Sequence, residues 1–234
     1  MTKKEDTVNV SKINKRKKSL RKIKLSLCII LICLILLYII LTVIYEEGRF
    51  TVSLDKNLML KKGITLYEDS SSKTPKEKLQ AGKIDFMDNI SIKWLPENIN
   101  NEADGAHNGD NYIAYTFYIE NNGDEEINYW SEIIIDDVIK DVDEAIRVML
   151  YVNGEKTVYA KNNSFTGQPE KDTKPFYSDT NVMLEQRKGF KPGETDKYTI
   201  VVWIEGDDPD CVNALLGGEI KMHMDIKEEH IEQK

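Results

Sequence analysis

The residues best suited to chemistry stand close together in the second half of the chain. Four carboxylates occupy the turn EGDDPDC: Glu205, Asp207, Asp208 and Asp210. Cys211 follows them directly, and His223 lies further along. Clustered carboxylates are the ligands that Ca²⁺ prefers, and a cysteine thiolate paired with a histidine can act as a nucleophile. The turn therefore offers two candidate sites, a calcium site and a Cys–His pair.

The acidic turn also has a structural interpretation. Residues 205–219 are typical of a short capped helix, with Asp208 as N-cap, Pro209 at the first helical position, Asp210 in the first turn and Gly217 past the end. An apolar face for burial would come from three residues, Val212, Leu215 and Leu216. Capping accounts for two of the four acids, and their spacing matches no calcium-binding loop. We therefore predict neither a metal nor a cofactor.

Catalytic motifs are missing from the sequence. It contains no G-x-S-x-G, H-E-x-x-H, C-x-x-C or phosphate-binding loop. The three histidines, His107, His223 and His230, are not paired in sequence as zinc ligands are. Cys211 is the only cysteine after residue 45, so it is either a partly buried thiol or a link to another chain. We predict that the protein is not an enzyme and assign no catalytic, cofactor-binding or metal residues.

The elements that position these residues are expected to be strands. Residues 112–120 and 219–227 alternate apolar and polar side chains with a period of two. Residues 197–205 are rich in β-branched and aromatic side chains, and Asn153-Gly154 between two apolar runs predicts a hairpin over 147–160. Further strands are expected over five segments: 50–54, 63–67, 83–94, 127–139 and 180–186. The fold class predicted is mainly β, a single antiparallel, jelly-roll-like β-sandwich.

Between the strands, the sequence predicts a short helical turn and two long loops. Asp141 and Glu144 have the spacing of a capping pair, which favours a turn from Val142 to Ala145. The polar segments 98–111 and 161–179 are longer than most loops. They are either a binding surface or variable surface loops.

One segment before the sandwich is long and apolar enough to cross a membrane. Residues 26–45 contain no charge, and a helix of that length covers about 30 Å, the thickness of a hydrocarbon core. A secretory signal has a shorter apolar region and then small residues at its cleavage site, which the exit TVIYEEG lacks. The sequence therefore predicts an uncleaved transmembrane helix over 26–45, in contact with the lipid bilayer.

Charge is divided unevenly about this segment. Residues 1–25 carry ten Lys or Arg and two acids, which leaves 22 basic and 38 acidic residues in 46–234. Because positive flanks stay on the cytoplasmic side, we predict a basic cytoplasmic tail (1–25) and one extracellular domain (46–234) in a single-pass cell-membrane protein. The basic tail has no aromatic residues and adjoins the span, so we expect contact with lipid and no nucleic-acid partner.

Several segments together resemble a known family. YIAYTFYIENNG, EAIRVMLYVNGEKTVYAK and KPGETDKYTIVVWIEGDDPDC…GGEIKMHMDI, within residues 110–226, resemble the exported β-sandwich proteins of Gram-positive bacteria related to camelysin and the biofilm-matrix protein TasA. The likeness is to membrane-anchored relatives of unknown function. Matrix proteins of that group are released by signal peptidase, whereas no cleavage site is evident here. The proteolytic activity of camelysin is not carried over, because no catalytic set matches.

Three functions remain open on this basis. We favour a cell-envelope structural or protein-interaction module, which presents an acidic β-sandwich outside the cell and meets another envelope protein or itself through a sheet edge or the long loops. The first alternative is a matrix or fibre-forming subunit released after signal cleavage. The second is a surface hydrolase or a ligand or metal sensor that uses Cys211, His223 and the acidic turn.

Overall fold

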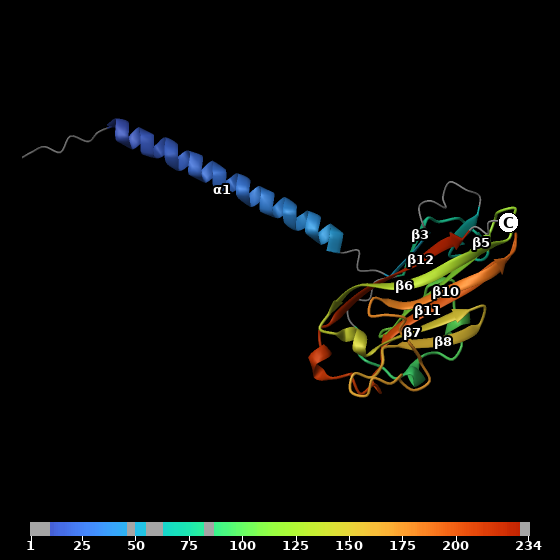
Figure 1. The fold of residues 1–234 in the computed structure, drawn as a ribbon. Coiled ribbons are helices and arrows are strands. Elements are labelled where there is room, and N and C mark those ends of the chain that lie inside the picture. Colours follow the sequence, from blue (N-terminus) through green and yellow to red (C-terminus); the bar gives the residue numbers. More distant parts are fainter. Residues whose placement is uncertain (1–9, 46–49, 55–62, 82–86, 230–234) are drawn as a thin grey trace, which may run out of the picture. The chain divides into compact units, whose positions relative to one another are not determined.

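The computed structural model describes residues 10–45, 50–54, 63–81 and 87–229. The chain separates into two compact units, Met1–Glu47 and Gly48–Lys234. Among the described residues, the first unit holds one helix and the second holds the strands (Figure 1).

Helix α1 runs from Val10 to Tyr45. It begins before the predicted span at Ser26 and takes in basic residues of the tail, because Lys and Arg are good helix formers. Its candidate membrane span, Arg16–Leu41, has 26 residues and contains an 18-residue window with a mean hydropathy of 3.0, none of which is buried in protein. This length and composition are sufficient to cross a bilayer, and a signal sequence near an N-terminus meets the same test.

The second unit is built from two sheets that pack face to face. The first sheet has the order β10 (Asn181–Phe190), β6 (Ile127–Ile139), β12 (Glu219–Glu229), β1 (Thr51–Leu54) and β3 (Lys78–Gln80). The second sheet has the order β2 (Ile64–Tyr67), β5 (Ile113–Asn121), β11 (Thr195–Ile204), β7 (Ile146–Val152), β8 (Glu155–Ala160) and β9 (Lys174–Pro175), with β4 (Gly105–Ala106) also on β5. The predicted mainly-β sandwich is confirmed.

The main core lies between the sheets and follows the predicted alternation. On β5, Tyr115, Phe117 and Ile119 are fully buried, and on β12, Met224 and Ile226 face them from the other sheet. The hairpin also forms as expected: Asn153 and Gly154 adopt φ of 53° and 89°, the left-handed conformation that a two-residue turn of this kind requires.

A second apolar cluster lies on the outer face of the second sheet. Ile90, Leu95 and Ile99 cover the buried Trp203 of β11. The predicted strand over 83–94 is wrong in its described part, 87–94, and residues 82–86 lie outside the described residues. Only an isolated bridge from Ile90 to Glu205 forms there, followed by the 3₁₀ helix η1 (Ile92–Trp94), whose first turn Ser91 caps. Apolar residues in this segment cover a sheet instead of joining one.

Two pairings depart from the antiparallel pattern. β1 runs parallel to β12, with Thr51 opposite His223, and β8 runs parallel to β9. A parallel pair needs a long connection, and almost the whole sandwich lies between β1 and β12 in sequence. The short strands β3, β4 and β9 were also not predicted, since two or three residues carry no periodic signal.

The predicted helical turn is present as η3 (Val142–Glu144), but its capping pair is wrong. Asp141 adopts a left-handed conformation and its side chain makes no cap hydrogen bond. Glu144 instead accepts a hydrogen bond from Lys161 at 2.9 Å. Lys161, the residue directly after β8, is the partner of Glu144 in place of the local one.

Candidate functional site

The acidic turn does not form the predicted capped helix. Only η4 (Asn213–Leu215) is helical, and it starts after Val212 and not at Pro209. Val212 and Leu216 are exposed, so the expected apolar face is not buried. Gly217 does follow the helical residues, with a φ of +71°. Asp208 does accept the cap-type hydrogen bond from the Asp210 backbone N–H. The chain does not continue as a helix, because Arg147 and Ser164 hold the Asp208 and Asp210 carboxylates from other parts of the chain.

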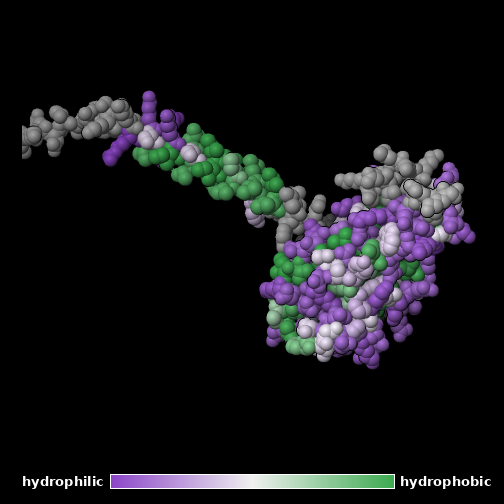
Figure 2. All heavy atoms as spheres, in the orientation of Figure 1, coloured by the Kyte–Doolittle hydropathy of each residue, from purple (hydrophilic) through white to green (hydrophobic). Residues whose placement is uncertain are grey.

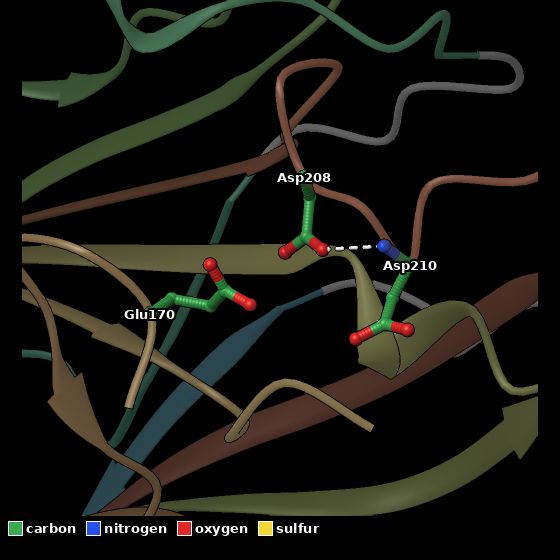
Figure 3. Close-up of side chains that lie close together, drawn as sticks. All are labelled: Glu170, Asp208 and Asp210. Carbon is green, nitrogen blue, oxygen red and sulfur yellow. Dashed lines mark hydrogen bonds between the residues drawn. The ribbon is translucent and has the colours of Figure 1, made fainter. Parts of the chain in front are cut away.

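Asp208 is engaged by Arg147, the second residue of β7. Both residues are buried, and the Arg147 guanidinium donates to Asp208 Oδ2. A buried charge is tolerated only with a partner of opposite sign. Pairing with Arg147 therefore holds the Asp208 side chain of the turn in a buried position. Figure 3 shows that the Asp208 carboxylate also faces Asp210, whose backbone N–H donates to Asp208 Oδ1 at 2.7 Å.

Asp210 fastens the long loop 161–179 to the turn. Its side chain accepts hydrogen bonds from the Ser164 backbone N–H, at 2.9 Å, and from the Ser164 hydroxyl. Asp143 and Glu144 hold the start of the same loop through Lys161, with Nζ–O distances of 2.5 and 2.9 Å. One of the two long polar loops, 161–179, is therefore held against the body of the sandwich by these contacts.

Glu170 brings a third carboxylate to this place (Figure 3). One oxygen from each of Glu170, Asp208 and Asp210 lies within 4.8 Å of the other two, an arrangement that a divalent cation can use. Glu170 Oε1 is buried without a hydrogen-bond partner, and Oε2 lies 4.0 Å from Arg147 Nη2. Arg147 already pairs with Asp208 here, and we call Arg147, Asp208 and Glu170 the arginine–carboxylate lock.

The other two acids of the candidate calcium site lie outside this group. Glu205 is buried and accepts from the Trp203 indole N–H and the Ile92 backbone N–H, both at 3.0 Å. Asp207 accepts from the Ser91 hydroxyl at 2.8 Å and faces Lys93 at 3.8 Å. The four acids therefore act in two separate structural groups. Asp208 and Asp210 bind Arg147 and Ser164, whereas Glu205 and Asp207 bind the segment around η1.

The candidate Cys–His pair is not assembled. Cys211 is half-buried, and burial, with Asp208 and Glu205 adding to it, raises the pKa of its thiol. His223 lies on the polar face of β12, where Nδ1 is 2.9 Å from Asp136 Oδ2. No hydrogen bond among the described residues joins Cys211 to His223. A raised thiol pKa lowers the thiolate fraction that a nucleophile needs.

The remaining histidines are likewise apart from the acidic turn. His107 lies in a loop, with Nδ1 3.0 Å from Gly105 O and Nε2 3.1 Å from Ile99 O. These contacts tie the segment around β4 to η2 (Ile99–Asn101). His230 lies outside the described residues.

A buried polar network lies inside the main core, where sequence analysis indicated nothing. Asp196 of β11 is buried and accepts from Tyr129 Oη at 2.6 Å, from Asn153 Nδ2 at 2.7 Å and from Arg187 Nε at 3.1 Å. Tyr198 Oη lies 2.9 Å from Tyr129 Oη. The network connects both sheets with the hairpin turn, so its evident role is to fix their register.

We expect this network to make tyrosine ionisation biphasic. Burial is the main cause that raises the pKa of Tyr129 far above its ordinary value and that of Tyr198 to about 12. Folding therefore opposes ionisation of these two tyrosines. The stability that they contribute as neutral groups is fully present below the unfolded pKa of about 10 and is lost as the pH rises above it. The near-ultraviolet absorbance of tyrosinate should rise once near pH 10 and again on alkaline unfolding. A single rise near pH 10 with the circular dichroism unchanged would contradict this.

Comparisons with known proteins identify no family for the chain. No family model and no curated protein match the chain. Two crystal structures of β-glucosidase from Kluyveromyces marxianus, one of them in complex with glucose, align with 72% of the chain. Identities are 10% and 12%, and TM-scores are 0.28 and 0.27. The chain spans only 16% and 17% of the length of those proteins.

Proposed function

We propose that the chain is a membrane-anchored structural or protein-interaction module of the cell envelope, which presents its sandwich outside the cell with the N-terminus in the cytoplasm. The observation that supports this most is the candidate membrane span within Arg16–Leu41, and the charge-free residues 26–45 follow the strongly basic residues 1–25. The proposal fits the resemblance to exported sandwich proteins of the camelysin and TasA group. It also fits the acidic composition of residues 46–234.

The open sheet edges support a role in binding another envelope protein or a second copy. Among the described strands, β10 has a hydrogen-bonded neighbour on one side only, and it is ten residues long. An edge of this kind offers unpaired backbone groups to a partner strand. Charged side chains on β10, among them Glu185, Arg187 and Lys188, oppose unspecific pairing and leave room for a selective partner.

We propose no enzymatic activity. The acids of the turn are held by Arg147, Ser164 and Trp203, and burial raises the pKa of Cys211. A released matrix subunit is the second candidate, because the helix also meets the test for a signal sequence.

Fractionation of cells that express the chain from its native start tests the anchor. We expect the full-length chain in the membrane fraction, and we expect protease added to intact cells to remove the part after residue 46. Mass spectrometry of the medium would detect the opposite outcome, a chain released by cleavage. A shorter chain beginning near residues 46–50 would overturn the anchor and favour the released subunit.

A further inference from the structure

Exposed apolar side chains of the sandwich gather at one end. We call this the loop end: the segments 87–95, 107–112, 140–145, 161–180 and 205–218, where β6, β8 and β11 finish and β5, β7, β10 and β12 begin. In the described part of the sandwich, every exposed large apolar side chain belongs to it: Ile92, Trp94, Phe165, Tyr177, Val212 and Leu216. In Figure 2, green surface appears at the lower left of the sandwich, where Figure 1 places the red-orange turn that contains η4.

These side chains are large and well exposed. Trp94, Phe165 and Leu216 are 72%, 78% and 68% exposed. The turns at the opposite end, residues 122–126, 153–154 and 191–194, contribute none of the exposed large apolar residues. Scattered exposed apolar residues need no explanation, but their concentration on one surface indicates a contact.

Three acids of the loop end are turned inward. Asp208 and Asp210 are buried against Arg147 and Ser164, and Asp143 is buried against Lys161. Other charged side chains of the loop end, among them Lys93 and Asp207, stay exposed beside the apolar ones. A surface of this composition suits the interface of a bilayer, where tryptophan and tyrosine are enriched.

Chain connectivity places the loop end within reach of a membrane. β1 runs parallel to β12, so the chain enters the sandwich from the loop end, with Thr51 opposite His223. β12 begins four residues earlier, at Glu219, and strand of that length covers about 13 Å. Only residues 46–49 separate Tyr45 from Phe50, and that stretch spans at most about 18 Å. The connection is long enough for the loop end to reach the bilayer surface and too short to lift the sandwich far from it.

We propose that the loop end rests on the lipid surface of the bilayer in which the helix is anchored, with Trp94, Phe165 and Leu216 inserted among the headgroups. This inference rests on the proposed membrane anchor. It gives the sandwich a defined orientation, with the hairpin turn Asn153-Gly154 directed away from the lipid. Contact through several apolar side chains adds affinity without a lipid-specific pocket.

Tryptophan quenching by brominated lipid tests the contact. The full chain is incorporated into phosphatidylcholine vesicles with and without brominated acyl chains. All three tryptophans, Trp94, Trp130 and Trp203, lie in the sandwich, and Trp203 is fully buried. We expect brominated lipid to reduce the emission of the wild-type chain and to leave that of Trp94→Phe unchanged.

A tryptophan at the opposite end provides the matched control. Lys156 is exposed near the hairpin turn, and we expect Lys156→Trp in the Trp94→Phe background to remain unquenched. Chain that floats with the vesicles but shows no quenching of Trp94 overturns the lipid contact and leaves the anchor intact. If Trp94 is then also shielded from acrylamide, the loop end contacts a second copy of the chain. Chain that does not float overturns the anchor itself.

Discussion

Replacing Arg147 by methionine is expected to lower the free energy of unfolding of the sandwich by about 3–5 kcal/mol. Arg147 and Asp208 are both buried, and Glu170 lies beside them. Methionine fills most of the space but leaves the Asp208 carboxylate without its counter-charge in a place that water does not reach. Urea unfolding of residues 48–234, which contain both apolar clusters, measures the change.

The exposed pair of Lys93 and Asp207 supplies the matched control. Its side chains are 81% and 64% exposed, so Lys93→Met should change stability by less than about 1 kcal/mol. Combining Arg147→Met with Asp208→Leu removes both charges and should recover part of the loss. A single Arg147→Met variant as stable as wild type would show that the lock contributes nothing.

Replacing Asp196 by alanine is expected to cost about 3 kcal/mol. The change removes the acceptor for Tyr129, Asn153 and Arg187 at once. The Tyr129 hydroxyl then keeps only Tyr198 in a buried position. Thermal and urea unfolding of the same fragment measure the loss.

An aspartate on an exposed face separates this effect from the general cost of losing a carboxylate. Asp225 of β12 accepts a hydrogen bond from Ser53 at 2.6 Å, and its side chain is 25% exposed. Asp225→Ala should cost less than about 1 kcal/mol. Equal losses for Asp196→Ala and Asp225→Ala would contradict the assigned role of the buried network.

Much of the fold follows from local patterns in the sequence. The alternation on β5 and β12 predicted both strands and the side that each one buries, and Asn153-Gly154 predicted the hairpin. Such signals depend only on near neighbours, so one sequence is sufficient to find them. The strand predicted over the segment 87–94 was wrong for the same reason. Its apolar residues cover Trp203 on the outer face of a sheet, and no local pattern distinguishes such residues from those of a strand.

The acidic turn shows what a local pattern leaves out. Asp208 and Pro209 favour a helix start, but the pairing of Asp208 with Arg147 joins residues that are 61 apart in the chain. Glu170, the third carboxylate of the group, was missed because nothing in the loop 161–179 indicates a partner in β7. Only the assembled sandwich brings these residues together. Their contacts outweigh the local tendency to continue as a helix, although Asp208 still accepts the cap-type hydrogen bond from Asp210.

The parallel pairing of β1 with β12 determines when the first sheet can be completed during synthesis of the chain. β1 is the first strand to be made, and it lies between β3 and β12, the last of the described strands. Because such distant segments meet only when the whole chain is present, the first sheet stays unfinished until the ribosome has completed residues 219–229. An exported chain tethered at its N-terminus would therefore spend its translocation with an open sheet, and the edges of β1 and β6 would be unpaired during that interval.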